Sequence, residues 1–88
     1  MASLRIEFRR SAERDLRRID SKLMTGIVTR IGDLVDNPRP RQALKLSGQR
    51  DLYRLRVGDY RVLYEIDSGA GVIIVSNLLH RREAYRDL

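Results

Sequence analysis

Arginine is the side chain in this sequence that is best suited to work on a charged substrate. Only Lys22 and Lys45 are lysines, so arginine supplies the other 16 of the 18 basic residues. Three of them, Arg54, Arg56 and Arg61, fall in a stretch where charged and hydrophobic residues alternate. Arginine presents a planar fork that grips phosphate through two parallel hydrogen bonds. The spacing therefore predicts a phosphate-binding surface, provided that the chain turns all three arginines the same way.

A two-residue turn at Gly58 and Asp59 decides how these arginines are placed. Glycine tolerates the positive φ that a tight hairpin turn requires, so the flanking residues are expected to pair across it. Arg56 then stands directly opposite Arg61, with the third arginine on the same exposed face of the sheet. Like charges in opposite positions destabilise a strand pair, so an anion is expected between them. The alternative is an ordinary solvated face on which Glu65 and Asp59 neutralise the arginines.

A second cluster of chemically active residue types stands near the end of the chain, formed by His80, Arg81, Arg82 and Tyr85. In a helix, Arg81 and Tyr85 lie one turn apart on one face. His80 is the only histidine, and histidine titrates near neutral pH without help. Tyr85 could instead pack the last helix against the core, and a lone histidine at a strand end is more often structural than catalytic. Spacing alone leaves both alternatives open.

Metal-free cleavage of RNA is the chemistry that fits these groups best. No His, Asp and Glu residues have the spacing of a metal site, there is no glycine-rich phosphate loop, and no cofactor is expected. RNA carries its own nucleophile, the 2′-hydroxyl beside the scissile phosphate. An enzyme must orient this hydroxyl, take its proton, stabilise the developing charge and protonate the leaving 5′-oxygen. Arginines suit the charge, and Tyr85 or His80 could move the protons.

The elements that position these residues follow from hydrophobic periodicity. Residues 4–8 alternate between apolar and charged types, which predicts a strand. Apolar residues spaced by three or four between positions 16 and 34 predict a short helix and a longer one. Ser11 is expected to cap the first helix and Asp20–Ser21 the second. Asn37–Pro40 then ends the helical region, because proline cannot continue a helix.

The second half of the sequence predicts a strand meander followed by a short helix. The run 72–75 is apolar on both faces, which predicts a central position in the sheet. Leu44 and Leu46 are expected either to form a short strand or to enter the core. The predicted strands are Leu52–Val57, Tyr60–Ile66 and Val72–Leu78, and the predicted helix is Arg81–Leu88.

This order of elements predicts an α+β fold in a single domain spanning residues 1–88. The simplest arrangement is a small, largely antiparallel sheet with the two N-terminal helices packed on one face and the short helix at the C-terminus. The net charge of +6 indicates a polyanionic partner. Cysteine is absent, and no apolar stretch approaches the length of a membrane span, so we expect a soluble, cytoplasmic protein.

Two strings of residues resemble a known family. The string Asp51–Ile66 resembles the core of RelE/ParE-superfamily toxins, and His80–Arg86 resembles their C-terminal signature. The N-terminal pattern through Asn37–Pro40 also fits, so the resemblance covers nearly the whole chain. It implies a RelE-like fold and the toxin of a type II toxin–antitoxin pair. RelE-type members are ribosome-dependent mRNA endonucleases that act in the A site and leave a 2′,3′-cyclic phosphate.

The resemblance also implies roles for individual residues. Arg61, Arg81 and Tyr85 match the catalytic positions of the RelE branch, and Arg54 and Arg56 match positions where RelE itself has lysines. Because arginine is effectively never deprotonated, neither of these two can serve as a base, which gives Tyr85 more weight as the residue that transfers the proton. The remaining expected residues are Lys45 and Arg82 for RNA and phosphate contacts and His80 as a reserve for proton transfer.

Partners and alternatives follow from the same resemblance. A small antitoxin, acidic or amphipathic, is expected to cover the basic face, and contact with promoter DNA is expected only through it. The ribosome and mRNA are the expected targets. The alternatives are a ParE-like inhibitor of DNA gyrase, which shares the fold but generally lacks the full catalytic set, and a non-catalytic relative that only binds its antitoxin. Retention of Arg61, Arg81 and Tyr85 favours the endonuclease.

Overall fold

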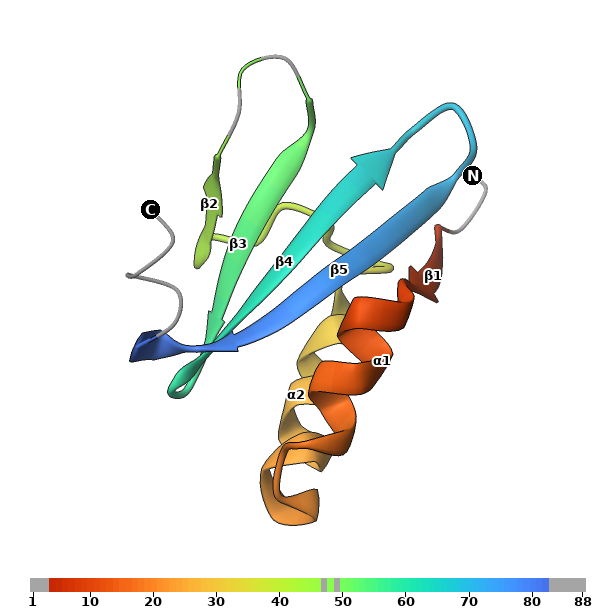
Figure 1. The fold of residues 1–88 in the computed structure, drawn as a ribbon. Coiled ribbons are helices and arrows are strands. Elements are labelled where there is room, and N and C mark those ends of the chain that lie inside the picture. Colours follow the sequence, from red (N-terminus) through yellow and green to blue (C-terminus); the bar gives the residue numbers. More distant parts are fainter. Residues whose placement is uncertain (1–3, 47, 49, 83–88) are drawn as a thin grey trace.

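In the described residues, a five-stranded sheet is covered on one face by the helices α1 and α2 (Figure 1). The computed structural model describes residues 4–46, 48 and 50–82. The strand order is β1-β5-β4-β3-β2, and β1 and β5 run parallel while the other neighbours are antiparallel. The predicted α+β fold is therefore confirmed. The elements are β1 (Arg5–Phe8), α1 (Arg10–Arg17), α2 (Ser21–Asp33), β2 (Ala43–Lys45), β3 (Leu52–Val57), β4 (Tyr60–Asp67) and β5 (Val72–His80).

The hydrophobic core lies between the helices and the inner face of the sheet. Alternate residues of β3 and β4 point toward α1 and α2, as the period of two requires. Neither helix of the described ranges is long and apolar enough to cross a membrane. The largest fully buried side chains are Tyr64, Ile31, Leu34, Leu55, Ile73, Val62 and Val75.

The β3–β4 hairpin has the register that its turn predicts. Gly58 has a φ of 60°, and no residue other than glycine has a positive φ in the described part of the chain. A glycine at the first turn position is the pattern of a type II′ turn, whose twist matches that of the strands. Val57 pairs with Tyr60, and Arg56 pairs with Arg61. The predicted pairing is confirmed along the whole hairpin.

A bulge in β5 joins the sheet to α1. Leu63 pairs with Asn77 and Tyr64 with Val75, so Ser76 is an extra residue in β5. The Ser11 hydroxyl donates a hydrogen bond to the Ser76 carbonyl (2.6 Å). Asp15 also serves the bulged segment, because its carboxylate accepts the Leu78 backbone N–H (2.9 Å). The backbone groups that the bulge releases from the ladder are thus satisfied by α1.

The predicted boundaries need several corrections. Ser11 does not cap α1, which begins at Arg10, because its hydroxyl is used by the bulge. Asp20 does cap α2, since its carboxylate accepts the Lys22 backbone N–H (3.0 Å). Leu44 lies in the short strand β2 and Leu46 follows it, and both are exposed.

The last strand also differs from its prediction. β5 extends to His80, two residues further than expected, and it is an inner strand whose neighbours are β1 and β4. The middle of the sheet belongs to β4. Arg81 and Arg82 are helical, and the rest of the predicted helix Arg81–Leu88 lies outside the described residues.

A polar clasp holds the loop after α2 against the sheet. The Arg39 side chain donates to the Tyr53 hydroxyl (2.8 Å) and pairs with Asp51, and the Tyr53 hydroxyl donates to Asp51 (2.7 Å). The hydrogen bond from Tyr53 lowers the pKa of Asp51, and the Arg39 guanidinium acts in the same direction. The Tyr64 hydroxyl donates to the Pro38 carbonyl (2.7 Å), and burial raises the pKa of Tyr64.

Candidate functional site

Three arginines share the sheet face that α1 and α2 leave uncovered. Arg56 and Arg61 are directly opposite each other, and Arg54 lies two residues before Arg56 on the same strand. Their neighbours in the hairpin, Leu55 and Val62, point into the core and are fully buried. Because side chains alternate along a strand, all three arginines point to the outer face. We call this group, Arg54, Arg56 and Arg61, the arginine face.

Arg61 is buried, although the sequence predicts that it is exposed. Only 6% of its surface is accessible, and its Nη1 donates to the carbonyls of Gly58 (3.2 Å) and Tyr60 (3.1 Å). The guanidinium is therefore folded back over the β3–β4 turn. A buried charge that is held by hydrogen bonds keeps a fixed position, which suits a group that must meet a developing negative charge.

Arg54 carries a buried nitrogen whose hydrogen-bonding capacity is unused. Its Nη1 is inaccessible to solvent and has no hydrogen-bond partner in the described ranges. A buried donor without a partner costs free energy, so such an atom in a folded protein needs an explanation. A bound phosphate oxygen would accept the hydrogen bond from this nitrogen and would bring a negative charge to the guanidinium.

The acidic residues near the arginine face are paired elsewhere. Glu65 forms an ion pair with Arg50 (2.8 Å), and Asp59 lies 3.9 Å from the Arg81 guanidinium. Within the described part of the chain, no carboxylate pairs with Arg54 or Arg56. The alternative in which Glu65 and Asp59 neutralise the arginines is therefore not what the structure shows for Arg54 and Arg56.

Arg81 lies at the β3–β4 turn, next to the end of the hairpin that carries Arg56 and Arg61. Its backbone N–H donates to the Asp59 carbonyl (2.7 Å), one residue from the Gly58 carbonyl that Arg61 contacts. Its side chain is 59% exposed. Arg82 follows, exposed, with its backbone N–H directed to Nδ1 of His80 (3.4 Å). Tyr85, the expected partner of Arg81, lies outside the described residues.

Two predicted site residues lie on the other side of the sheet. His80 pairs with Tyr60, and their rings meet edge to face with centroids 5.4 Å apart. Lys45 pairs with Tyr53, whose side chain belongs to the core. Directly paired residues share a face, so neither His80 nor Lys45 joins the arginine face. The extension of β5 to His80 determines the position of the histidine.

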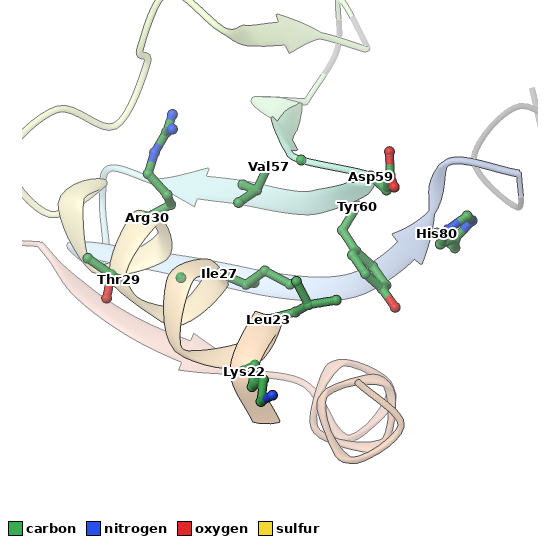
Figure 2. Close-up of a pocket in the computed structure, with 11 residues that line it drawn as sticks. Lys22, Leu23, Ile27, Thr29, Arg30, Val57, Asp59, Tyr60 and His80 are labelled. Atoms are coloured by element: carbon green, nitrogen blue, oxygen red, sulfur yellow. The ribbon is translucent and has the colours of Figure 1, made fainter. Parts of the chain in front are cut away.

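A cavity that the sequence does not predict lies on the helix side of the sheet. It has a volume of about 590 Å³ and opens between α2 and the β3–β4 turn (Figure 2). Leu23, Ile27, Val57 and Tyr60 give it an apolar lining, and Leu23 is 55% exposed. Lys22, Arg30 and His80 also border it. We call it the apolar groove. Leu23 belongs to the predicted helical stripe, but the spacing of the stripe alone cannot show that the sheet leaves this residue uncovered.

The arginine face has the chemistry to bind a phosphate diester. It combines the buried guanidinium of Arg61, a buried nitrogen of Arg54 without a partner among the described residues, and Arg56, with Arg81 at the adjoining turn. No group of three His, Asp or Glu side chains that could hold a metal ion is found among residues 4–46, 48 and 50–82. These features define a cationic site on a small α+β scaffold.

Comparisons with known proteins agree on one family. The family model described as the ParE toxin of the type II toxin–antitoxin system parDE matches residues 6–85. Toxin RelE of Mycobacterium tuberculosis is 32% identical over 77 residues, which are 86% of this chain and 79% of that protein.

Solved structures show the same fold. The RelBE2 toxin–antitoxin complex of M. tuberculosis superposes with a TM-score of 0.77 at 27% identity, covering 91% of this chain and 100% of that chain. The archaeal RelE–RelB complex of Pyrococcus horikoshii gives the same score and identity over 91% and 97% of the two chains. Isolated RelE from E. coli, at 20% identity and a TM-score of 0.76, shares the fold over 99% of this chain and 100% of its own. The chain belongs to the RelE/ParE superfamily of type II toxin–antitoxin toxins.

Proposed function

We propose that this toxin is an mRNA endonuclease that acts on translating ribosomes. The observation that carries the proposal is Nη1 of Arg54, a buried guanidinium nitrogen without a partner in the described ranges, on a face that also holds Arg56 and Arg61. Successive phosphates of the RNA backbone would satisfy this nitrogen and offset the charges of Arg56 and Arg61.

The proposed reaction needs no metal. The 2′-oxygen attacks the adjacent phosphorus, the bond from phosphorus to the 5′-oxygen breaks, and the products carry a 2′,3′-cyclic phosphate and a 5′-hydroxyl. One group accepts the proton of the 2′-hydroxyl, and one gives a proton to the leaving oxygen. Arg61 and Arg81 stabilise the charge on the phosphate, because both gather at the same turn. Arg54, Arg56 and Arg82 bind neighbouring phosphates.

Proton transfer is assigned to Tyr85 in this proposal. Arginine does not lose its proton in proteins, so the arginine face supplies charge but no base. His80 and Lys45 lie on the helix side of the sheet and are left out of the proposed site. A tyrosine with a usual pKa of about 10 would act as a base only if neighbouring arginines favoured its phenolate form.

The proposed partners are a cognate antitoxin, the ribosome and mRNA. Two of the similar structures are complexes of a RelE-type toxin with its antitoxin, which supports an antitoxin partner for this chain. An acidic antitoxin segment would be attracted by the net charge of +6 and would cover the arginine face. Promoter DNA would be contacted only through the antitoxin, and the toxin would act in the cytoplasm.

Inhibition of DNA gyrase is the second candidate, because the matching family model describes a ParE toxin. Production of the toxin without antitoxin distinguishes the two. We expect cleaved mRNA with 2′,3′-cyclic phosphate ends, formed only during translation and also in the presence of a metal chelator. Arg56→Gln and Tyr85→Phe should each lower cleavage strongly, while Arg5→Gln, on an edge strand, should not. Intact mRNA together with blocked supercoiling would instead establish the gyrase inhibitor.

A further inference from the structure

Another cavity lies on the outer face of the sheet, at the end away from the β3–β4 turn. Its volume is about 340 Å³, and its lining includes Arg9, Arg50, Leu52, Glu65, Ile74 and Asn77. Leu52 pairs with Glu65, and Glu65 pairs with Ile74, so these three residues form a row across β3, β4 and β5. Glu65 and Arg61 are both on the outer face, four residues apart on β4. The cavity and the arginine face therefore belong to one continuous surface.

The lining of the cavity combines two aliphatic side chains with several polar and charged groups. Leu52 and Ile74 are half-buried aliphatic side chains that stand on either side of Glu65. Arg9 and Asn77 add hydrogen-bonding groups from two other segments. A nucleobase has the matching character, since its faces are apolar and its edges carry donors and acceptors. A phosphate or a sugar alone would leave the aliphatic side chains unused.

The ion pair between Arg50 and Glu65 indicates which base edge fits. Arg50 Nη2 lies 2.8 Å from Oε1 of Glu65, so a donor group stands beside an acceptor group at the cavity. The Watson–Crick edge of guanine presents a carbonyl acceptor beside two N–H donors. The carboxylate of Glu65 would accept from those donors, and the guanidinium of Arg50 would donate to the carbonyl.

The distance between the cavity and the arginine face suits one RNA strand. Glu65 and Arg61 are four positions apart along β4, which is about 13 Å at about 3.3 Å per residue. Stacked nucleotides rise by about 3.4 Å per step, so about four steps cover this distance and fewer suffice for an extended strand. An RNA whose scissile phosphate lies on the arginine face can thus place a nearby base in the cavity.

We propose that this cavity is a base-reading subsite that favours guanine within about four nucleotides of the cleavage point. The proposal rests on the endonuclease function, because it describes where the same RNA strand continues. Arg50 and Glu65 read the edge of the base, while Leu52 and Ile74 contact its face. Arg9 contacts the phosphate of the same nucleotide, since it is a long cationic side chain among the residues that line the cavity.

The test is a cleavage profile on mRNAs with randomised codons in a translating extract. For the wild type we expect guanine to be enriched at one position within about four nucleotides of the cut. Glu65→Gln replaces an acceptor with a donor of the same shape and should reduce that enrichment by a factor of about five or more, as loss of a paired base contact does. Ile74→Ala should weaken it by removing the contact with the base.

Glu7→Gln is the matched control. Glu7 is also an outer-face glutamate paired with an arginine, Arg5 at 3.2 Å, but it lies outside the cavity. This variant should keep the wild-type profile and rate. Cleavage by all variants with an unchanged base profile would overturn the subsite and leave the endonuclease standing. A change only in antitoxin affinity would assign the cavity to a protein partner and also overturn it. Absence of cleavage by the wild type would overturn both proposals.

Discussion

Replacement of Arg54 by methionine should make the isolated toxin more stable and less active. Nη1 of Arg54 is buried and has no hydrogen-bond partner in the described ranges, and no carboxylate found there pairs with the side chain. Methionine is similar in length and leaves no unsatisfied donor. The change also removes one positive charge from a face where Arg56 and Arg61 already oppose each other.

The size of the effect follows from the one nitrogen of Arg54 that has no partner within the described part of the chain. Leaving a buried donor unsatisfied costs about 1 to 3 kcal/mol, so Arg54→Met should raise the free energy of unfolding by about that amount. For a domain of this size, each 1 kcal/mol raises Tm by about 4 to 8 °C. Thermal and urea unfolding, followed by circular dichroism, measure the change. RNA cleavage should fall, because the variant cannot bind the phosphate.

An experiment with a ligand distinguishes two causes of higher stability in Arg54→Met, the loss of an unoccupied phosphate site and a general improvement in packing. A non-cleavable RNA analogue stabilises the native state according to its affinity, so it should raise Tm of the wild type more than that of Arg54→Met. Arg5→Met is the control, because Arg5 makes an exposed ion pair with Glu7 and should change stability by about 0 to 1 kcal/mol. If Arg54→Met unfolds more easily than the wild type, the nitrogen is satisfied in solution and the reasoning is wrong.

Two further predictions concern stability alone. Arg61→Ala should lower the free energy of unfolding by about 1.5 to 3 kcal/mol, because hydrogen bonds from a buried charge to the Gly58 and Tyr60 carbonyls are lost; an unchanged urea midpoint would contradict the burial of Arg61. Burial raises the pKa of Tyr64, so its contribution to stability is complete below the usual tyrosine value of about 10 and is lost as pH rises above it. Urea unfolding between about pH 8 and 11 should therefore show an alkaline decline that is smaller in Tyr64→Phe, and equal declines in the two proteins would refute the assignment.

The hairpin could be predicted from the sequence because two local rules agree there. Alternation of residue types fixes which side chains share a face, and a two-residue turn that begins with Gly58 fixes the register. A shift by one residue would turn the arginines inward and the core residues outward, so no other register of this hairpin has a similar stability. Both rules act over a few residues, which is why Arg56 and Arg61 are found opposite each other as expected.

Other expectations were wrong where a segment far away in the sequence determines the contacts or the position of a residue. Ser11 has the chemistry of a helix cap, but its hydroxyl binds the carbonyl of Ser76, which is 65 residues away. That bulge also changes the alternation in β5 and brings His80 opposite Tyr60. Lys45 lies on the helix side because the pairing of β2 with β3 sets its face, and no turn of fixed length joins these two strands.

The sequence by itself determined the α+β class, the strand meander and the alignment of three arginines on one sheet face. Each of these depends on periodicity or on a turn, and both are properties of neighbouring residues. Only the tertiary structure decided that Arg61 is buried, that a nitrogen of Arg54 has no partner among the described residues and that Glu65 pairs with Arg50 beside a cavity. Burial and the choice of hydrogen-bond partner depend on contacts between segments that are far apart in the sequence, and the spacing of residues does not predict those contacts.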